Sequence, residues 1–156
     1  MKYRLTNETK DFLGRKLHRI VAVRHFNRID VGTKGGYVES RDNLSQYGNA
    51  WVADDACVVD DGWVCDDALV CGEAVVARNA IVRGSARVGG SAFVDNYAQV
   101  YDRATLCGNA CACDNSRVCD DALVCGDALV YGNGKVCGSA YIGGCDHVKG
   151  NDIINN

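Results

Sequence analysis

Seventeen consecutive six-residue blocks run from Ala50 to Asn151 without an insertion or a deletion. The first position of the block is Ala in 13 of them, and the third is Val, Leu or Ile in every block except the one that contains Ala112. A fixed period of six residues is typical of parallel β-helices, in which each block forms one short strand and one corner. The repeat therefore predicts an all-β solenoid, and no other feature of the chain constrains the fold as strongly.

The pattern inside the block indicates which side chains face inward. Successive side chains of a strand point to opposite faces, so positions one and three share one face and positions two and four share the other. The Ala and Val of positions one and three are expected to fill the interior. Positions five and six are mostly Asp, Gly, Asn or Ser, which accept turn and left-handed conformations. Three blocks close a triangular coil, and about 5.7 coils stacked at about 4.8 Å make a rod roughly 27 Å tall. Its packed interior leaves any binding to the outer faces.

Two parts of the sequence carry a family resemblance. The block pattern resembles that of the left-handed β-helix hexapeptide-repeat proteins. The stretches Gly14–Ile20, Gly32–Glu39 and Asn43–Ser45, the last leading into Gly48–Val52, are similar to the YdcK-like branch found in bacteria and phages. This resemblance implies a single-stranded left-handed parallel β-helix. It also implies an acetyltransferase label, which in that branch derives largely from the fold.

The composition constrains the fold, the state of the cysteines and the expected cellular location. The chain has 18 Gly and no Pro, as suits repeated corners and a sheet whose strands nearly all have two neighbours. No apolar run is long enough to span a membrane, and the first residues lack the apolar core of a signal peptide. Of ten Cys, seven occupy the fourth block position and none forms a CxxC pair. We therefore expect free thiols, no metal and a cytoplasmic location.

The chain is expected to have three parts: an N-terminal capping segment (1–49), the solenoid (50–151) and a C-terminal tail (152–156). The cap is predicted to be mainly a β-hairpin folded onto the first coil, with room for a short helical turn over residues 6–13. It has a net charge of +5, whereas the rest of the chain has −8. Its candidate basic docking residues are Arg15, Arg19, Arg24 and Arg28. Direct nucleic-acid binding is not expected from so mixed a segment.

Acidic pairs crowd the first coil. They can be solvated corner residues, a cation site, or a negative surface presented to a protein; several ligand oxygens would have to converge for cation binding, and these corners point in three directions. The residues concerned are Asp54, Asp55, Asp60, Asp61, Asp66 and Asp67.

The outer residues form three ladders with an 18-residue spacing, and one ladder is the most apolar. A long apolar face on a small rod usually marks an interface. We therefore expect a homo-oligomer, a dimer or trimer, that associates through this face; the alternative is that these residues only satisfy β propensity. The candidate interface residues are Val59, Val75, Phe93, Leu129 and Tyr131.

Catalysis has one candidate residue. Acyl-CoA-dependent transferases of this fold resemble one another in using a His base beside a cleft, often with a loop that interrupts the repeat. Here His147 is the single plausible base and the repeat has no interruption, so no acetyl-CoA cleft is predicted. The function expected first is a non-catalytic, self-associating solenoid that binds a protein partner, with a phage-encoded inhibitor of a host system as one version. The alternatives are an acyltransferase that uses acetyl-CoA and a structural or assembly protein.

Overall fold

The N-terminal segment begins with a long hairpin. In the computed structural model, which describes residues 1–156, β1 (Tyr3–Phe12) and β2 (Arg15–Ala22) are antiparallel around a turn at Leu13 and Gly14. This confirms the predicted hairpin. The helical turn expected over residues 6–13 is absent, because residues 9–12 pair with β2 and complete a strand. The one helical segment is the 3₁₀ turn η1 (Arg41–Asn43), which a capping box at Ser40 begins.

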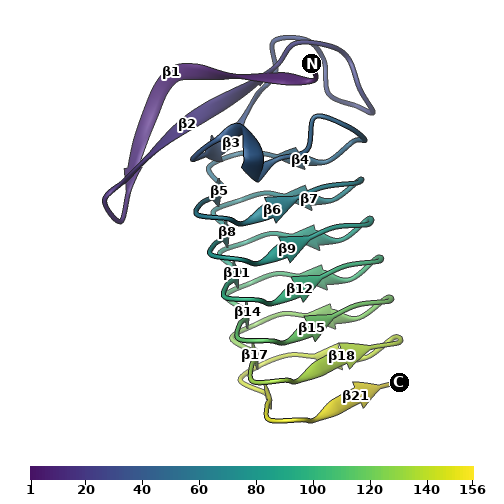
Figure 1. Ribbon diagram of the computed structural model, residues 1–156. Helices are drawn as coiled ribbons and strands as arrows, with labels where there is room; N and C mark the ends of the chain where they lie inside the picture. The colour runs from purple at the N-terminus through teal and green to yellow at the C-terminus, as the bar shows by residue number, and fades with distance from the viewer.

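The rest of the chain winds into a rod with three sides (Figure 1). The first side continues from the hairpin, since β3 (Lys34–Val38) is antiparallel to β2 and parallel to β5. Its further strands are β5 (Cys57–Val58), β8 (Val75–Val76), β11 (Phe93–Val94), β14 (Cys111–Ala112), β17 (Leu129–Val130) and β20 (His147–Val148).

The other two sides hold six strands each, and all of these run parallel. The second side contains β4 (Trp51–Val52), β7 (Leu69–Val70), β10 (Arg87–Val88), β13 (Thr105–Leu106), β16 (Leu123–Val124) and β19 (Tyr141–Ile142). The third side contains β6 (Trp63–Val64), β9 (Ile81–Val82), β12 (Gln99–Val100), β15 (Arg117–Val118), β18 (Lys135–Cys137) and β21 (Ile153–Asn155). Paired residues lie 18 positions apart, as the block length predicts; Gln99, for example, lies between Ile81 and Arg117.

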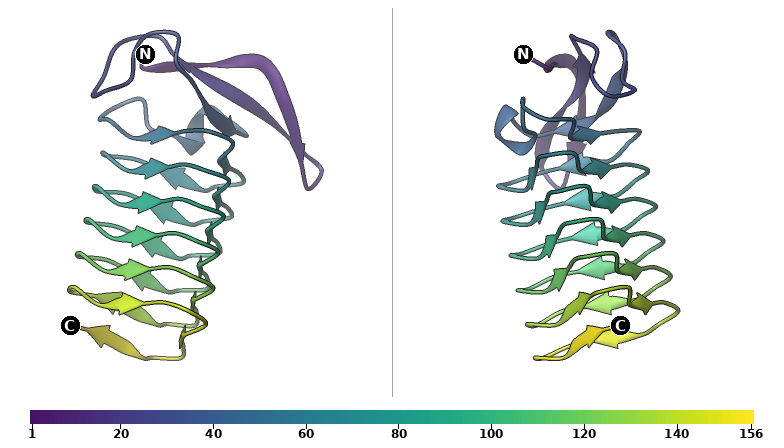
Figure 2. Two further views of the ribbon diagram at one scale, coloured as in Figure 1. Left: turned by 180° about the vertical axis from the view of Figure 1, so that it is seen from behind. Right: turned by 90° about the vertical axis from the view of Figure 1, so that its right-hand side faces the viewer.

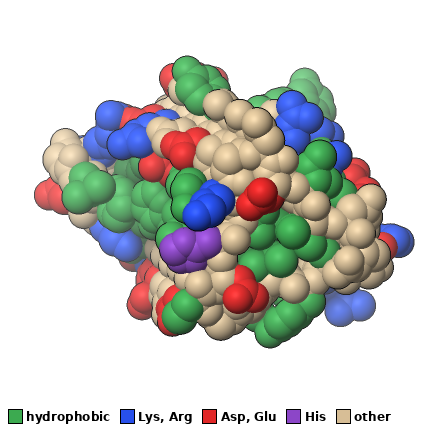
Figure 3. Space-filling model, turned by 90° about the horizontal axis from the view of Figure 1, so that it is seen from below, with side chains coloured by type: hydrophobic (Ala, Val, Ile, Leu, Met, Phe, Trp, Pro, Cys, Tyr) green, Lys and Arg blue, Asp and Glu red, His purple; other side chains and the backbone are tan.

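The interior is filled by the first and third block positions. A single core cluster of 37 buried residues runs through the rod, and most of its members are the Ala and Val of those positions. Seen from the C-terminal end, side chains fill the rod and no opening leads into it (Figure 3). The predicted packed core is thus confirmed. Ser116 departs from the pattern, because it places a fully buried hydroxyl, without a hydrogen-bond partner, where most blocks have Ala.

The corners depend on residues that tolerate a left-handed backbone. The fifth block position has positive φ whether it is Asp, as at Asp54 (φ 55°), or Gly, as at Gly108 (φ 64°). Asp and Asn reach this region at lower cost than most side chains, and Gly reaches it freely. An added Cβ at Gly108 would also lie 2.9 Å from the backbone N of Gly126 in the next coil. The positive φ explains the narrow choice of residues at this position, and the close approach favours Gly at Gly108 in particular.

The stack is longer than the predicted 5.7 coils. On the first side alone, seven parallel strands run from β3 to β20, and Leu44 forms an isolated parallel bridge with Val64 on the third side. At the other end, Ile153–Asn155 joins the third side as β21 instead of forming a separate tail. The six-residue period could not reveal the first coil, because the loop between Leu44 and Val52 is two residues longer than a block and separates this coil from the next by 20 residues instead of 18. No helix in the structure is long and apolar enough to cross a membrane.

Candidate functional site

The hairpin covers the upper part of the first side. A second cluster of buried residues joins Leu17 of β2 and Tyr37 of β3 to outward-facing residues of the rod, namely Cys57, Val59, Val75 and Ala77. Figures 1 and 2 show the hairpin slanting from the top of the rod down to the level of β5 and β8. Val59 and Val75, expected on a free interface, are therefore only 2% and 9% exposed. The sequence pattern did not show that β2 pairs with the first strand of this same side.

The lower part of the first side stays uncovered. Phe93 packs against the edge of the hairpin cluster and is half-buried, as are Leu129 and Tyr131 further down. Cys111 and Cys113 lie between them and are half-buried too. We call these five residues the lower strip. Three of the five candidate interface residues therefore remain available to another molecule.

His147 ends this side and is exposed. Its ring meets that of Tyr131 edge to face with centroids 6.0 Å apart, and no carboxylate hydrogen-bonds to it. None of the four grooves on the surface is lined by His147. A general base is normally oriented by a hydrogen bond and adjoins a concave substrate site. The other two histidines bond within the cap: His18 Nδ1 lies 3.2 Å from the Thr6 carbonyl oxygen, and His25 Nδ1 lies 2.9 Å from Asp30.

The acidic residues at the fifth block position bind the next coil. One carboxylate oxygen of Asp54 accepts a hydrogen bond from the backbone N–H of Gly72 at 2.9 Å. Asp66 does the same for Gly84 at 3.0 Å, and Asp60 for Arg78 at 3.3 Å. These three carboxylates therefore link the corners of successive coils.

The acidic residues at the sixth position differ from one another. Asp67 accepts a 3.0 Å hydrogen bond from the Asn49 amide, and Asp55 lies 3.6 Å from Arg19. The carboxylate of Asp61 has neither a hydrogen bond nor an ion pair. Among the six acidic residues singled out from the sequence, Asp61 alone is without a partner.

Two of the four candidate basic residues attach the hairpin to the rod. Arg15 pairs with Glu39 at 2.9 Å and also with Asp60. Arg19 donates to the Gly35 carbonyl and to the Tyr37 hydroxyl, both at 2.7 Å, while its guanidinium stacks on the Tyr37 ring. The positive cap and the acidic first coil thus neutralise each other in part. The remaining two, Arg24 and Arg28, are exposed on the loop that follows β2.

All ten cysteines are free. Burial raises the pKa of the Cys65 thiol to about 11 and that of Cys111 to about 12, which keeps both protonated at neutral pH. One set of possible metal ligands comes together: the Sγ atoms of Cys119 and Cys137 and a carboxylate oxygen of Asp120 lie within 4.8 Å of one another. Two thiolates and a carboxylate are ligands that zinc accepts. The sequence signal for this set was two fourth-position cysteines 18 residues apart, not a CxxC pair.

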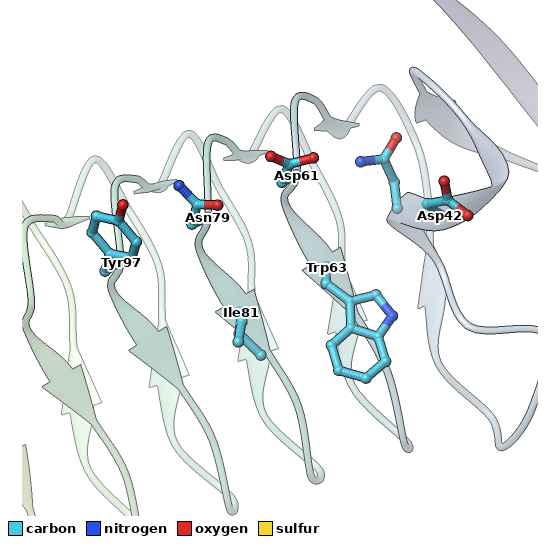
Figure 4. A pocket seen from close by; sticks show the side chains of 7 residues that line it. Asp42, Asp61, Trp63, Asn79, Ile81 and Tyr97 are labelled. Carbon is cyan, nitrogen blue, oxygen red and sulfur yellow. The ribbon is translucent and has the colours of Figure 1, made fainter.

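The largest concavity lies on the third side, near the top of the rod. This upper groove has a volume of about 460 Å³. Asp61, Asn79 and Tyr97 follow one another along its edge at the corners before β6, β9 and β12, while Trp63 and Ile81 project from the strands (Figure 4). Asp42 and Asn43 of η1 close its end. The sequence analysis did not identify this groove, although the 18-residue spacing places its residues in line.

A second concavity continues along the same side. This lower groove has a volume of about 300 Å³ and repeats the arrangement of the upper one with different residues. Its corner residues are Asn115, Asn133 and Asn151, and its strand residues are Arg117, Lys135 and Ile153. The third side therefore changes from acidic and aromatic at the top to basic and amide-rich at the bottom.

Comparison with known proteins gives one partial match. No family model matches the chain. A stretch of 61 residues is 38% identical to a protein of Escherichia coli (strain K12) named uncharacterized acetyltransferase YdcK. The match covers 34% of this chain and 19% of YdcK, so most of that protein has no counterpart in it. The chain is therefore a hexapeptide-repeat β-solenoid that resembles YdcK over about a third of its length.

Proposed function

We propose that this chain is a non-catalytic β-solenoid that associates with itself and binds a protein partner through its outer sides. The observation that carries the proposal is the lower strip, an apolar row left half-exposed directly below the hairpin. The packed interior supports it as well, since a ligand can be held only on the outside. The ten free cysteines favour the reducing cytoplasm as the setting. Because phages encode members of the resembling branch, a host protein is the first partner to seek.

Capture of a partner from bacterial lysate tests the proposal, with two leucine variants as a matched pair. Leu129 on the first side and Leu123 on the second occupy the same block position and are both half-buried. We expect the wild-type protein and Leu123→Glu to retain the same protein, and Leu129→Glu to lose it. Equal capture by both variants would place the partner elsewhere. No reproducible partner would favour the structural or assembly role.

An acyltransferase is the second candidate, and the name of YdcK favours it. Calorimetric titration with acetyl-CoA separates the two functions. An acyltransferase predicts saturable binding and turnover that His147→Ala abolishes. The non-catalytic proposal predicts no heat of binding at millimolar acetyl-CoA.

A further inference from the structure

Three rows of outward side chains run along the third side, and two of them border the grooves. The strand row contains Trp63, Ile81, Gln99, Arg117 and Lys135, and adjacent members pair in the parallel ladder. The corner row contains Asp61, Asn79, Tyr97, Asn115 and Asn133. Both grooves lie between these two rows. The strand row continues below Lys135 to Ile153, and the Leu44 bridge adds a level above Trp63, so three levels lie on either side of Gln99.

The upper half of this side offers acceptors and aromatic faces. The carboxylates of Asp42 and Asp61 form no ion pair, and both line the upper groove. Trp63 is 43% exposed and Tyr97 is 64% exposed, although both are large aromatic side chains. Carboxylates beside an exposed indole attract a cation, because the indole face is the strongest cation–π acceptor among the side chains. A lysine or arginine therefore matches the upper groove.

The lower half carries such cations. Arg117 and Lys135 line the lower groove, and neither forms an ion pair or a side-chain hydrogen bond within the chain. The other cationic side chains near the upper groove either interact with a partner within the chain or do not line the groove. Arg78 is bound to Asp95 at 3.1 Å, and Arg83 stacks on Tyr101 on the opposite edge of the strand row. Arg41 is exposed beside Asp42 but does not line the groove.

We propose that the third side binds a second copy of this chain, with the two rods side by side and antiparallel. A two-fold axis that lies in the interface, parallel to β12 and perpendicular to the rod axis, exchanges the β6 level of one copy with the β18 level of the other, and β9 with β15. Lys135 of each copy then faces Asp61 and Trp63 of the other, and Arg117 faces the level of Asn79 and Ile81. Such an interface is isologous, so every favourable contact occurs twice. The inference rests on the self-association in the proposed function and assigns it to the third side, which leaves the lower strip for the protein partner.

The size of the surface indicates a weak dimer. Five strands stacked at about 4.8 Å span roughly 24 Å, and six extended residues with a corner are about 18 Å wide. Two such faces bury on the order of 900 Å², at the low end for specific interfaces, which is the range of transient complexes. Because charged pairs contribute, salt weakens the dimer.

Sedimentation of charge-reversal variants tests the inference with the intact protein. Lys135→Glu and Asp61→Lys should each weaken the dimer at least about tenfold, since each places like charges opposite one another twice. An equimolar mixture of the two variants should restore association, because both contacts are then between opposite charges. Lys149→Glu, which reverses an exposed cation on the first side, serves as the control and should leave the dimer unchanged. Circular dichroism of each variant verifies the fold.

The outcomes separate the two levels of the proposal. A wild-type protein that stays monomeric at millimolar concentration would refute self-association itself. A wild-type dimer that tolerates both reversals would refute the third side as the interface and return association to the first side. Variants that weaken the dimer singly but fail to associate when mixed would refute the antiparallel two-fold arrangement.

Discussion

Leu17→Ala tests whether the hairpin is held on the first side by the small cluster that Leu17 anchors. Leu17 is fully buried among Tyr37, Cys57, Val59 and Val75, and it does not belong to the core of the rod. Truncating a fully buried leucine costs about 2–5 kcal/mol in other proteins. The loss should fall on the part of the hairpin near its turn, since Tyr3, Ile20 and Ala22 at the other end of the hairpin stay in the 37-residue core.

Hydrogen exchange read by mass spectrometry measures this loss locally. Even 2 kcal/mol corresponds to roughly 30-fold faster exchange of the amides that open with the hairpin. Peptides from β1 and β2 should show this acceleration, while peptides from β6 to β21 keep their protection. Lys16→Ala, at the exposed neighbouring position, is the control and should leave exchange unchanged. The ion pairs of Arg15 with Glu39 and of Arg19 with Asp55 persist in the variant, but surface pairs contribute about 1 kcal/mol or less each.

Two results would refute the reasoning. Unchanged protection of β2 would mean that the cluster does not hold the hairpin. Equal acceleration in the hairpin and the rod would mean that they open as a single unit. If the hairpin does open, Val59 and Val75 become accessible, and a hydrophobic dye should bind the variant more strongly than the wild-type protein.

Three further predictions concern stability. Ser116→Ala should raise the free energy of unfolding in urea by about 1 kcal/mol, because it removes a buried hydroxyl that has no partner; a loss of stability would show that the hydroxyl is satisfied. Asp66→Ala should lower the free energy of unfolding by about 1–3 kcal/mol, since Ala is strained at φ 59° and the Gly84 N–H loses its acceptor. Asp66→Gly should lower this free energy less, because Gly adopts positive φ without strain. Burial lowers the pKa of the Lys2 ammonium to about 8, so the folded protein releases this proton at lower pH than the unfolded chain does. Unfolding at several pH values should therefore show the wild-type protein gaining stability relative to Lys2→Met between pH 8 and 10.5, by roughly 3 kcal/mol; a constant difference would contradict the burial of the charge.

The interior and the corners of the rod could be predicted from the sequence, because the same physical requirements recur in every block. A side chain at position one or three must fit the narrow interior, so Ala and Val recur and reveal the period. Position five must adopt positive φ, and Asp or Gly recurs there for that reason. The 18-residue register, the three sides and the packed core all follow from this repetition.

The hairpin and the first coil lack that repetition, and the predictions are least accurate there. Nothing in the alternation of Leu17 and Ile20 indicates that one enters the small cluster and the other the main core. The placement of Val59 on a free surface failed for the same reason, since its cover comes from a strand more than 35 residues earlier. The sequence predicts Arg19 on a docking surface, whereas its side chain contacts Tyr37 and Gly35 within the chain.

The outer positions carry what distinguishes one side of the rod from another. Side chains at positions two, four and six point outward, and their backbone is not required to adopt positive φ. These residues can therefore vary without destabilising the coil. Each variation is stacked directly on the residue 18 positions away, and a gradual change along the chain becomes a gradient along a side. On the third side this gradient runs from Asp61 and Trp63 to Arg117 and Lys135, and a gradient of charge on a straight rod is complementary to its own reverse. Exchanging Trp63 with Lys135 and Asp61 with Asn133 in one chain should therefore preserve folding and the antiparallel dimer, because the gradient is inverted but intact. Trp63→Lys combined with Asp61→Asn makes both ends of the side alike, and this double variant should fold but no longer dimerise.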